Sequence, residues 1–211
     1  MGNVFKGKTV LFQGDSVTDR GRDRSDPYGL GGGYPARVAA VYNALFPGSG
    51  AVFLNRGISG NRVGDLLARY EADFLAPAPD VLSILIGIND TWRRYDNNDP
   101  TAPEAFEATY RTLLTRIRRD MPRVRLLLIE PFVLPVPPDR LRWREDLDPK
   151  IHAVRRLAAA FADAYLPADG LLAGYLAAGL APSDIAADGV HPTDAGHGLL
   201  AGDWLRCAGV I

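Results

Sequence analysis

Short apolar runs alternate with longer stretches of helical periodicity along this chain. The runs at 82–86 and 126–129 are almost entirely apolar, which predicts strands that are buried on both faces. We predict five strands, at residues 9–12, 51–55, 81–86, 124–129 and 164–166. Apolar spacings of three and four predict helices between these strands. The helices span residues 34–46, 63–75, 103–120, 148–162, 170–178 and 193–208.

Alternating β and α elements with buried strands predict an α/β fold, in which helices cover both faces of a parallel sheet. The chain contains no internal repeat and no low-complexity linker, so we predict one domain over residues 1–211. The formal net charge of -1 gives no general attraction to nucleic acid or to an anionic membrane, and we expect neither as a partner.

The cysteine content and the start of the chain bear on the cellular compartment. A single cysteine, Cys207, cannot form an internal disulfide, which is compatible with a reducing compartment. The first residues lack the long apolar segment of a secretion signal, and no apolar run reaches about 18 residues. We therefore expect a cytoplasmic protein.

A serine follows the first predicted strand almost directly. Gly14 ends that strand as a turn residue, and Ser16 comes two residues later. In a parallel α/β sheet, ligands bind outside the carboxyl ends of the strands, so Ser16 is well placed to be a nucleophile. The same segment is also ordinary turn chemistry, and the interpretation depends on partners elsewhere in the chain.

Two further candidate residues follow the next two strands. Gly57 comes after the second strand and Asn89 after the third. With the strand order 2-1-3-4-5, the first strand lies between them, and Gly57 and Asn89 would flank Ser16. The N–H groups of Ser16 and Gly57 and the side-chain amide of Asn89 would then form an oxyanion hole. Taken singly, Gly57 is also a turn glycine, and Asn89 is also a helix cap or an Asx turn.

A histidine near the C-terminus has the surroundings of a general base. A serine hydroxyl needs such a base within hydrogen-bond reach. His191 lies in a loop before the last predicted helix, and Asp188, three residues earlier, can accept its Nδ1–H. His152 and His197 fall inside predicted helices, where we expect surface or packing roles. The predicted triad is Ser16, His191 and Asp188, and its chemistry needs no metal and no organic cofactor.

Together these segments resemble the SGNH hydrolases, the GDSL-type esterases, whose serine, glycine, asparagine and histidine come from four blocks in this chain order. Ser16, Gly57, Asn89 and His191 match the four, and Asp188 matches the aspartate three residues before the histidine. The resemblance spans nearly the whole chain and implies a flavodoxin-like three-layer α/β/α sandwich with a five-stranded parallel sheet. Valine stands at position 17 where the first block of the family has leucine, an apolar replacement.

Segments 14–19, 57–61, 86–96 and 191–197 look most like intracellular bacterial acetylxylan esterases of this group. That likeness implies a small-molecule substrate, an acetyl ester of a xylo-oligosaccharide, and assembly into a homo-oligomer. Trp92 and Tyr95, beside Asn89, could wall an acyl pocket or form a sugar platform, and with Asp15 they are the candidate substrate-binding residues. Alternatively, the two aromatic residues belong to the core side of the next helix.

Three alternatives remain open. An arylesterase, thioesterase or lipase-like member of the same family would act on longer acyl chains. A non-enzymatic flavodoxin-like domain would hold a phosphate at the first turn, although two carboxylates there oppose an anion. A divalent-metal hydrolase would use Asp15, Asp19, Asp188 and His191.

Two long loops also leave alternatives open. Loop 18–33 is expected to be a solvated connection, because its charges nearly cancel. Loop 131–143, which is rich in proline, could be a pocket rim or an oligomer contact.

Overall fold

The five predicted strands form one all-parallel sheet in the computed structural model, which describes residues 2–211. The strands are β1 (Thr9–Gly14), β2 (Val52–Asn55), β3 (Val81–Leu85), β4 (Arg125–Ile129) and β5 (Ala164–Leu166). Their order, β2-β1-β3-β4-β5, confirms the prediction. Phe12 of β1 pairs with Asn55 of β2 and with Ser83 of β3, so these three strands end at the same edge of the sheet.

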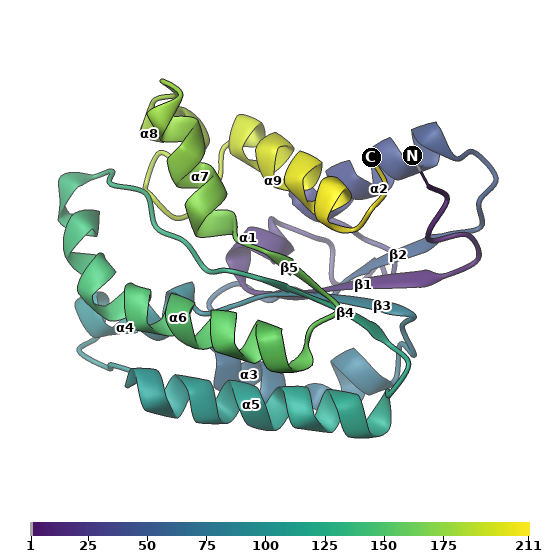
Figure 1. The fold of residues 1–211 in the computed structure, drawn as a ribbon, viewed down its shortest axis with the longest axis horizontal. Helices are drawn as coiled ribbons and strands as arrows, with labels where there is room; N and C mark the ends of the chain where they lie inside the picture. The colour runs from purple at the N-terminus through teal and green to yellow at the C-terminus, as the bar shows by residue number, and fades with distance from the viewer. Residues whose placement is uncertain (1) are drawn as a thin grey trace.

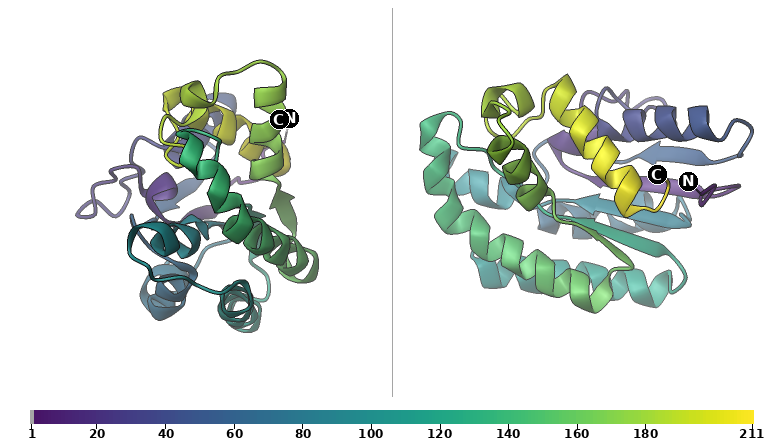
Figure 2. Two further views of the ribbon diagram at one scale, coloured as in Figure 1. Left: turned by 90° about the vertical axis from the view of Figure 1, so that its left-hand side faces the viewer. Right: turned by 45° about the horizontal axis from the view of Figure 1, so that its top comes forward.

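Helices cover both faces of the sheet, which confirms the three-layer arrangement (Figure 1). One face packs against α2 (Tyr34–Leu45), α7 (Ala168–Ala177) and α9 (Asp194–Cys207). The other packs against α3 (Val63–Ala68), α5 (Pro103–Asp120) and α6 (Arg144–Phe161). None of the helices described within residues 2–211 combines the length and the apolar composition needed to cross a membrane. The two ends of the chain lie next to each other (Figure 2), where Gly2 N–H donates to the carbonyl of Val210 at 3.1 Å.

Some helices differ from the prediction in extent. The helix predicted at 63–75 is divided into α3 and a π-helical turn, η1 (Glu71–Leu75). Helix α6 begins at Arg144 rather than at 148, and therefore contains Pro149 in its second turn. Proline has no N–H to donate to the carbonyl four residues earlier, that of Glu145. Because Glu145 is exposed, solvent can hydrogen-bond this carbonyl, and the helix tolerates the proline.

Four short elements have no counterpart in the prediction. They are α1 (Ser16–Asp19), α4 (Ile88–Asp96), the 3-10 helix η2 (Pro138–Trp143) and α8 (Pro182–Ile185). The sequence of α4 is mostly polar, and its one apolar stripe consists of Ile88, Trp92 and Tyr95, at spacings of four and three residues, which pack in one cluster. A stripe this short was not recognised as a helix in the prediction.

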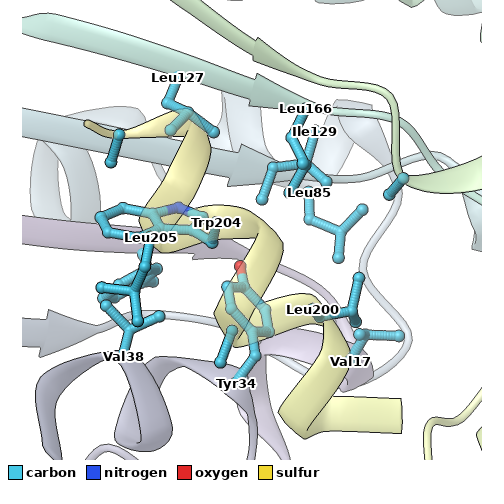
Figure 3. Packing of buried hydrophobic residues seen from close by; sticks show 14 of the residues in the cluster. Val17, Tyr34, Val38, Leu85, Leu127, Ile129, Leu166, Leu200, Trp204 and Leu205 are labelled. Carbon is cyan, nitrogen blue, oxygen red and sulfur yellow. The ribbon is translucent and has the colours of Figure 1, made fainter. Parts of the chain in front are cut away.

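The core on the α2/α9 side is centred on Trp204 of α9 (Figure 3). Its ring is fully buried and lies 5.2 Å, centroid to centroid, from that of Phe12 in β1. Its indole N–H donates to Ser83 Oγ of β3 at 2.9 Å, which satisfies the one polar atom of the ring. Since α9 starts three residues after His191, this anchor fixes the helix that follows the candidate general base.

Candidate active site

Ser16 is the first residue of α1, immediately beyond the carboxyl end of β1. Asp15 caps this short helix, because its Oδ1 accepts the N–H of Val17 at 3.0 Å. Gly14 is required at the turn, since a Cβ there would lie 2.3 Å from the carbonyl oxygen of Leu85. The result is a partly exposed serine hydroxyl at the edge where β1, β2 and β3 end. Figure 1 shows α1, α4 and the start of α9 on this same side of the molecule.

Ser16, His191 and Asp188 form a continuous hydrogen-bonded chain, as predicted. Ser16 Oγ lies 2.9 Å from His191 Nε2, and His191 Nδ1 lies 2.6 Å from Asp188 Oδ2. Asp188 Oδ1 accepts the backbone N–H groups of Val190 and His191 at 2.9 and 2.7 Å. A carboxylate that accepts Nδ1–H leaves Nε2 free to accept the serine proton. The arrangement can therefore activate the hydroxyl as a nucleophile.

The charges of the triad are set by these contacts. Partial burial alone would raise the pKa of Asp188, but the hydrogen bonds from the His191 side chain and from two backbone N–H groups hold that pKa well below its usual range. The Asp188 hydrogen bond, followed by the negative charges of Asp188 and Asp15, outweighs burial and raises the pKa of His191. Asp188 is therefore ionised at neutral pH and favours the protonated imidazole that forms when His191 takes a proton.

Asn89 lies in the first turn of α4, directly after β3. The residue is 3 % exposed, and its amide Nδ2 donates to the carbonyl of Asn61 at 3.1 Å. An amide nitrogen carries two hydrogens, so a second donor remains after this bond. The contact also brings the loop after β2 against the start of α4.

The position of Gly57 argues against its predicted role as an oxyanion donor. Its N–H donates to the side-chain oxygen of Asn55 at 2.8 Å. A Cβ at position 57 would lie 2.5 Å from the backbone nitrogen of Asp19, so the glycine allows the loop to pack closely on α1. The single N–H of Gly57 is thus already hydrogen-bonded. The structure supports the alternative prediction for this residue, a turn glycine that allows close packing.

Gly60, three residues later in the same loop, is the better placed main-chain donor. Asn61 N–H donates to the carbonyl of Ile58 at 3.1 Å, which closes a turn with Gly60 at its third position and a φ of +85°. In such a turn the N–H of the third residue points outward, and within residues 2–211 the backbone contacts show no acceptor for it. The next residue, Asn61, contacts Asn89, so Gly60 lies on the same side of the site. The turn pattern Ile-Ser-Gly-Asn was the available sequence signal.

A buried ion pair holds the helix that carries Asn89. Lys150 of α6 is fully buried and donates to the Asp146 carboxylate and to Thr91 Oγ1 of α4, the latter at 3.2 Å. Asp146 also accepts from Arg94 of α4 at 3.2 Å. Two residues of α4 are thus joined to α6 by charged hydrogen bonds.

Comparison with known proteins identifies the family. The sequence pattern of the GDSL-like lipase/acylhydrolase family matches residues 12–199. The chain is 37% identical over 212 residues to an acetylxylan esterase from Geobacillus stearothermophilus, covering 96% of this chain and 94% of that protein. This chain belongs to the GDSL-like lipase/acylhydrolase family. It is accordingly a carboxylic ester hydrolase, related to acetylxylan esterase, and the non-enzymatic alternative is excluded.

Solved structures of similar proteins agree with this assignment. A catalytic variant of the Geobacillus stearothermophilus esterase, with a serine replaced by alanine, superposes with a TM-score of 0.88 at 35% identity, covering 100% of this chain and 98% of that one. A second catalytic variant of that enzyme has a histidine replaced by alanine. An alpha/beta hydrolase enzyme from the metagenome of Lake Arreo superposes with a TM-score of 0.89 at 32% identity, covering 99% of both chains.

The candidate substrate-binding residues of this GDSL-family esterase differ in their access to the site. Asp15 is only 1 % exposed and its carboxylate caps α1, so direct substrate contact there is not supported. Burial raises the pKa of Asp15 to about 7. Trp92 is half-buried, with its ring 5.6 Å from that of His191, centroid to centroid. Tyr95 instead stacks on Trp143 at 5.2 Å and donates to the carbonyl of Arg142 at 2.9 Å.

Loop 131–143 packs beside Asp188 and His191. It contributes Arg140 and Trp143, to which the sequence analysis gave no role. The Arg140 guanidinium lies 5.5 Å from the ring of Trp92 and 4.1 Å from that of Trp143. Arg140 Nε also donates to the carbonyl of Asp188 at 3.0 Å. The loop is therefore a wall beside the triad, as the pocket-rim alternative expected.

The carboxylates of the metal-hydrolase alternative do not converge on one point. Asp15 contacts the Val17 N–H, Asp19 contacts Arg24 and Ser59, and Asp188 contacts His191. In the described part of the chain, residues 2–211, no group of three or more His, Cys, Asp or Glu side chains is arranged to hold a metal ion.

Proposed function

We propose that this esterase removes acetyl groups from xylo-oligosaccharides through an acyl-serine intermediate on Ser16. The observation that carries the proposal is the hydrogen-bonded chain from Ser16 Oγ through His191 to Asp188. The relationship to an acetylxylan esterase, at 37% identity, supports the substrate class. The catalytic serine and histidine of that relative support the roles of Ser16 and His191.

In the proposed reaction, His191 Nε2 takes the proton of Ser16 Oγ as the oxygen attacks the ester carbonyl carbon. The carbonyl oxygen becomes an oxyanion, which accepts from the N–H groups of Ser16 and Gly60 and from the Asn89 amide. When the intermediate collapses, the bond to the sugar oxygen breaks and His191 gives its proton to that oxygen. Water then attacks the acyl-serine by the same route, which releases acetate and restores Ser16.

The residues beside the triad are closely packed. Val17, Ile88 and Val190 are the chain neighbours of Ser16, Asn89 and His191, and they line a buried cavity of about 10 Å³, which has room for one water molecule and for no part of a long acyl chain. The His191 side chain is 38% exposed, so a bulky sugar can approach from solvent, and Trp92 offers it an aromatic face.

The test is a substrate panel with parent and Ser16→Ala enzyme. We expect kcat/KM on p-nitrophenyl acetate to exceed that on the octanoate by at least about tenfold, since each methylene that a site excludes is worth about 10-fold or more. Acetylated xylo-oligosaccharides should release acetate. Ser16→Ala should lose turnover on every substrate.

Two results would contradict the proposal. Full activity in Ser16→Ala would remove the nucleophile. A preference for octanoate would favour the longer-chain esterase alternative.

We also propose that residues 1–211 form a single domain and that the protein is cytoplasmic. From the family likeness we propose that it forms a homo-oligomer. Light scattering would measure the oligomer, and cell fractionation the location. Limited proteolysis that released a stable fragment would contradict the single domain.

A further inference from the structure

The loop that carries Gly60 is attached to the helix that carries Ser16. Asn55 Nδ2, at the start of this loop, donates to the carbonyl of Thr18 at 2.6 Å. Gly57 packs on the backbone of Asp19, and Ser59 hydrogen-bonds to the side chain of Asp19. The oxyanion loop, residues 55–61, thus contacts the second half of α1, residues 18 and 19, at three points.

Asp19 is the centre of this attachment. Its Oδ2 accepts from Ser59 N–H at 2.9 Å, from Ser59 Oγ–H at 3.0 Å and from Arg24 at 2.9 Å. Its Oδ1 accepts the backbone N–H of Arg22 at 3.2 Å. Its residue surface is 3 % exposed, and burial alone would raise its pKa, but the hydrogen bonds from Arg24 and Ser59 outweigh burial and lower that pKa. Asp19 is therefore an ionised, nearly buried acceptor at neutral pH.

We propose that Asp19 is a positioning residue of the oxyanion hole, which holds the Ser59–Gly60 turn at a fixed distance from Ser16. The proposal rests on the proposed function, because it assigns the N–H of Gly60 to the oxyanion. Ser16 and Asp19 are one helical turn apart on α1, so a single rigid element carries both the nucleophile and the acceptor. The two ends of the turn are held elsewhere, because Ile58 N–H donates to the carbonyl of Gly14 at 3.0 Å and Asn89 donates to the carbonyl of Asn61. Between them, the Asp19 carboxylate is the acceptor of the Ser59 N–H among the contacts of residues 2–211, so without it the Ser59–Gly60 peptide can rotate away from its orientation toward the site.

Loop 18–33 also contacts the oxyanion loop and Asp19. Arg22 Nε donates to the carbonyl of Gly57 at 2.9 Å, and Arg24 pairs with Asp19. Two arginine side chains of loop 18–33 therefore bind the oxyanion loop and the carboxylate of Asp19. Residues 23–28 of the loop are exposed, in agreement with the solvated connection that its balanced charges predicted.

The experiment compares Asp19→Asn with Asp23→Asn and the parent. Asparagine has the same shape as aspartate, but one of its two oxygens is replaced by an NH2 group, which cannot accept. Both oxygens of Asp19 accept N–H groups, so in either orientation the amide NH2 faces a donor and at least one hydrogen bond is lost. We expect kcat per active site, counted with a serine-directed phosphonate, to fall about 10- to 100-fold with KM little changed. Affinity for a boronic acid, which forms a tetrahedral anion on Ser16, should fall in proportion to kcat/KM.

Asp23→Asn is the matched control, since it removes the same charge from the same loop. The Asp23 carboxylate accepts from the N–H and the hydroxyl of Ser25 at 2.8 and 2.6 Å, on the exposed side of the loop. Its kcat should equal that of the parent. If Asp19→Asn does not fold, Ser59→Ala decides, because it removes one of the two bonds to Asp19 and should lower kcat per site a few-fold.

Two outcomes would overturn the proposal while leaving the esterase intact. One is an Asp19→Asn enzyme whose kcat per active site equals that of the parent. If Asp19→Asn does not fold, the corresponding outcome is a Ser59→Ala enzyme whose kcat per active site equals that of the parent. The other is an equal loss in Asp23→Asn. If instead the parent shows no Ser16-dependent turnover at all, the proposed function itself has failed, which the phosphonate count and Ser16→Ala reveal separately.

Discussion

Replacing Lys150 by methionine should lower the free energy of unfolding by about 3–5 kcal/mol, because it leaves the buried carboxylate of Asp146 without its nearest cation. Lys150 is 0% and Asp146 4% exposed in the side chain, so water cannot replace the lost contact. Arg94 still pairs with Asp146 at 3.2 Å, but its side chain is 44% exposed, which places the expected loss toward the lower end of the range.

The magnitude converts to a measurable temperature. A chain of 211 residues has an unfolding entropy of about 2.1 cal/mol/K per residue, so each kcal/mol moves Tm by about 2.3 °C. Lys150→Met should therefore melt about 7–11 °C below the parent in a thermal scan. Urea titration should show a lower midpoint with an unchanged slope.

A double variant separates the unpaired charge from lost packing. Lys150→Met with Asp146→Leu removes both charges, and should be more stable than Lys150→Met alone. Arg156→Met is the surface control, because the Arg156 side chain in its pair with Glu107 is 59% exposed, and it should leave Tm almost unchanged. A Lys150→Met protein as stable as the parent would refute the reasoning, and so would a double variant less stable than the single one.

Three further predictions concern the site. The Asp188 hydrogen bond raises the pKa of His191 above 6.5, and only neutral His191 can accept the serine proton. In a pH–rate profile, kcat/KM should therefore fall with decreasing pH through a midpoint above 6.5, and a midpoint below 6.5 would contradict this. Asp188→Asn should lower kcat by about 10³- to 10⁴-fold and shift that midpoint to lower pH, which a pH–rate profile of the variant measures. Gly57→Ala should lower the free energy of unfolding in urea by about 1–3 kcal/mol, because its Cβ would lie 2.5 Å from the backbone nitrogen of Asp19. Gly64→Ala, whose Cβ meets nothing within 4 Å, should not lower it. Equal stability of the two variants would refute the packing role of Gly57.

The periodicity of the chain determined most of the fold. Buried strands have a local signature, an unbroken apolar run, and helix α5 has an apolar stripe, so 103–120 was predicted with the bounds it has. The triad was also within reach of sequence, because Asp188 and His191 are only three residues apart. Ser16 and His191 are 175 residues apart, yet both follow recognisable elements of a fold whose strand order was predicted correctly.

Only the tertiary structure decided which groups are free to act. The sequence places glycines at positions 57 and 60, but it does not show which of their N–H groups is free. In the structure the side chain of Asn55 accepts the N–H of Gly57. Likewise Asp15 and Asp19 are both acidic neighbours of Ser16, and their roles differ because one caps α1 while the other meets Ser59. Hydrogen bonds are short and directional, so their partners follow from the three-dimensional path of the backbone and not from residue type.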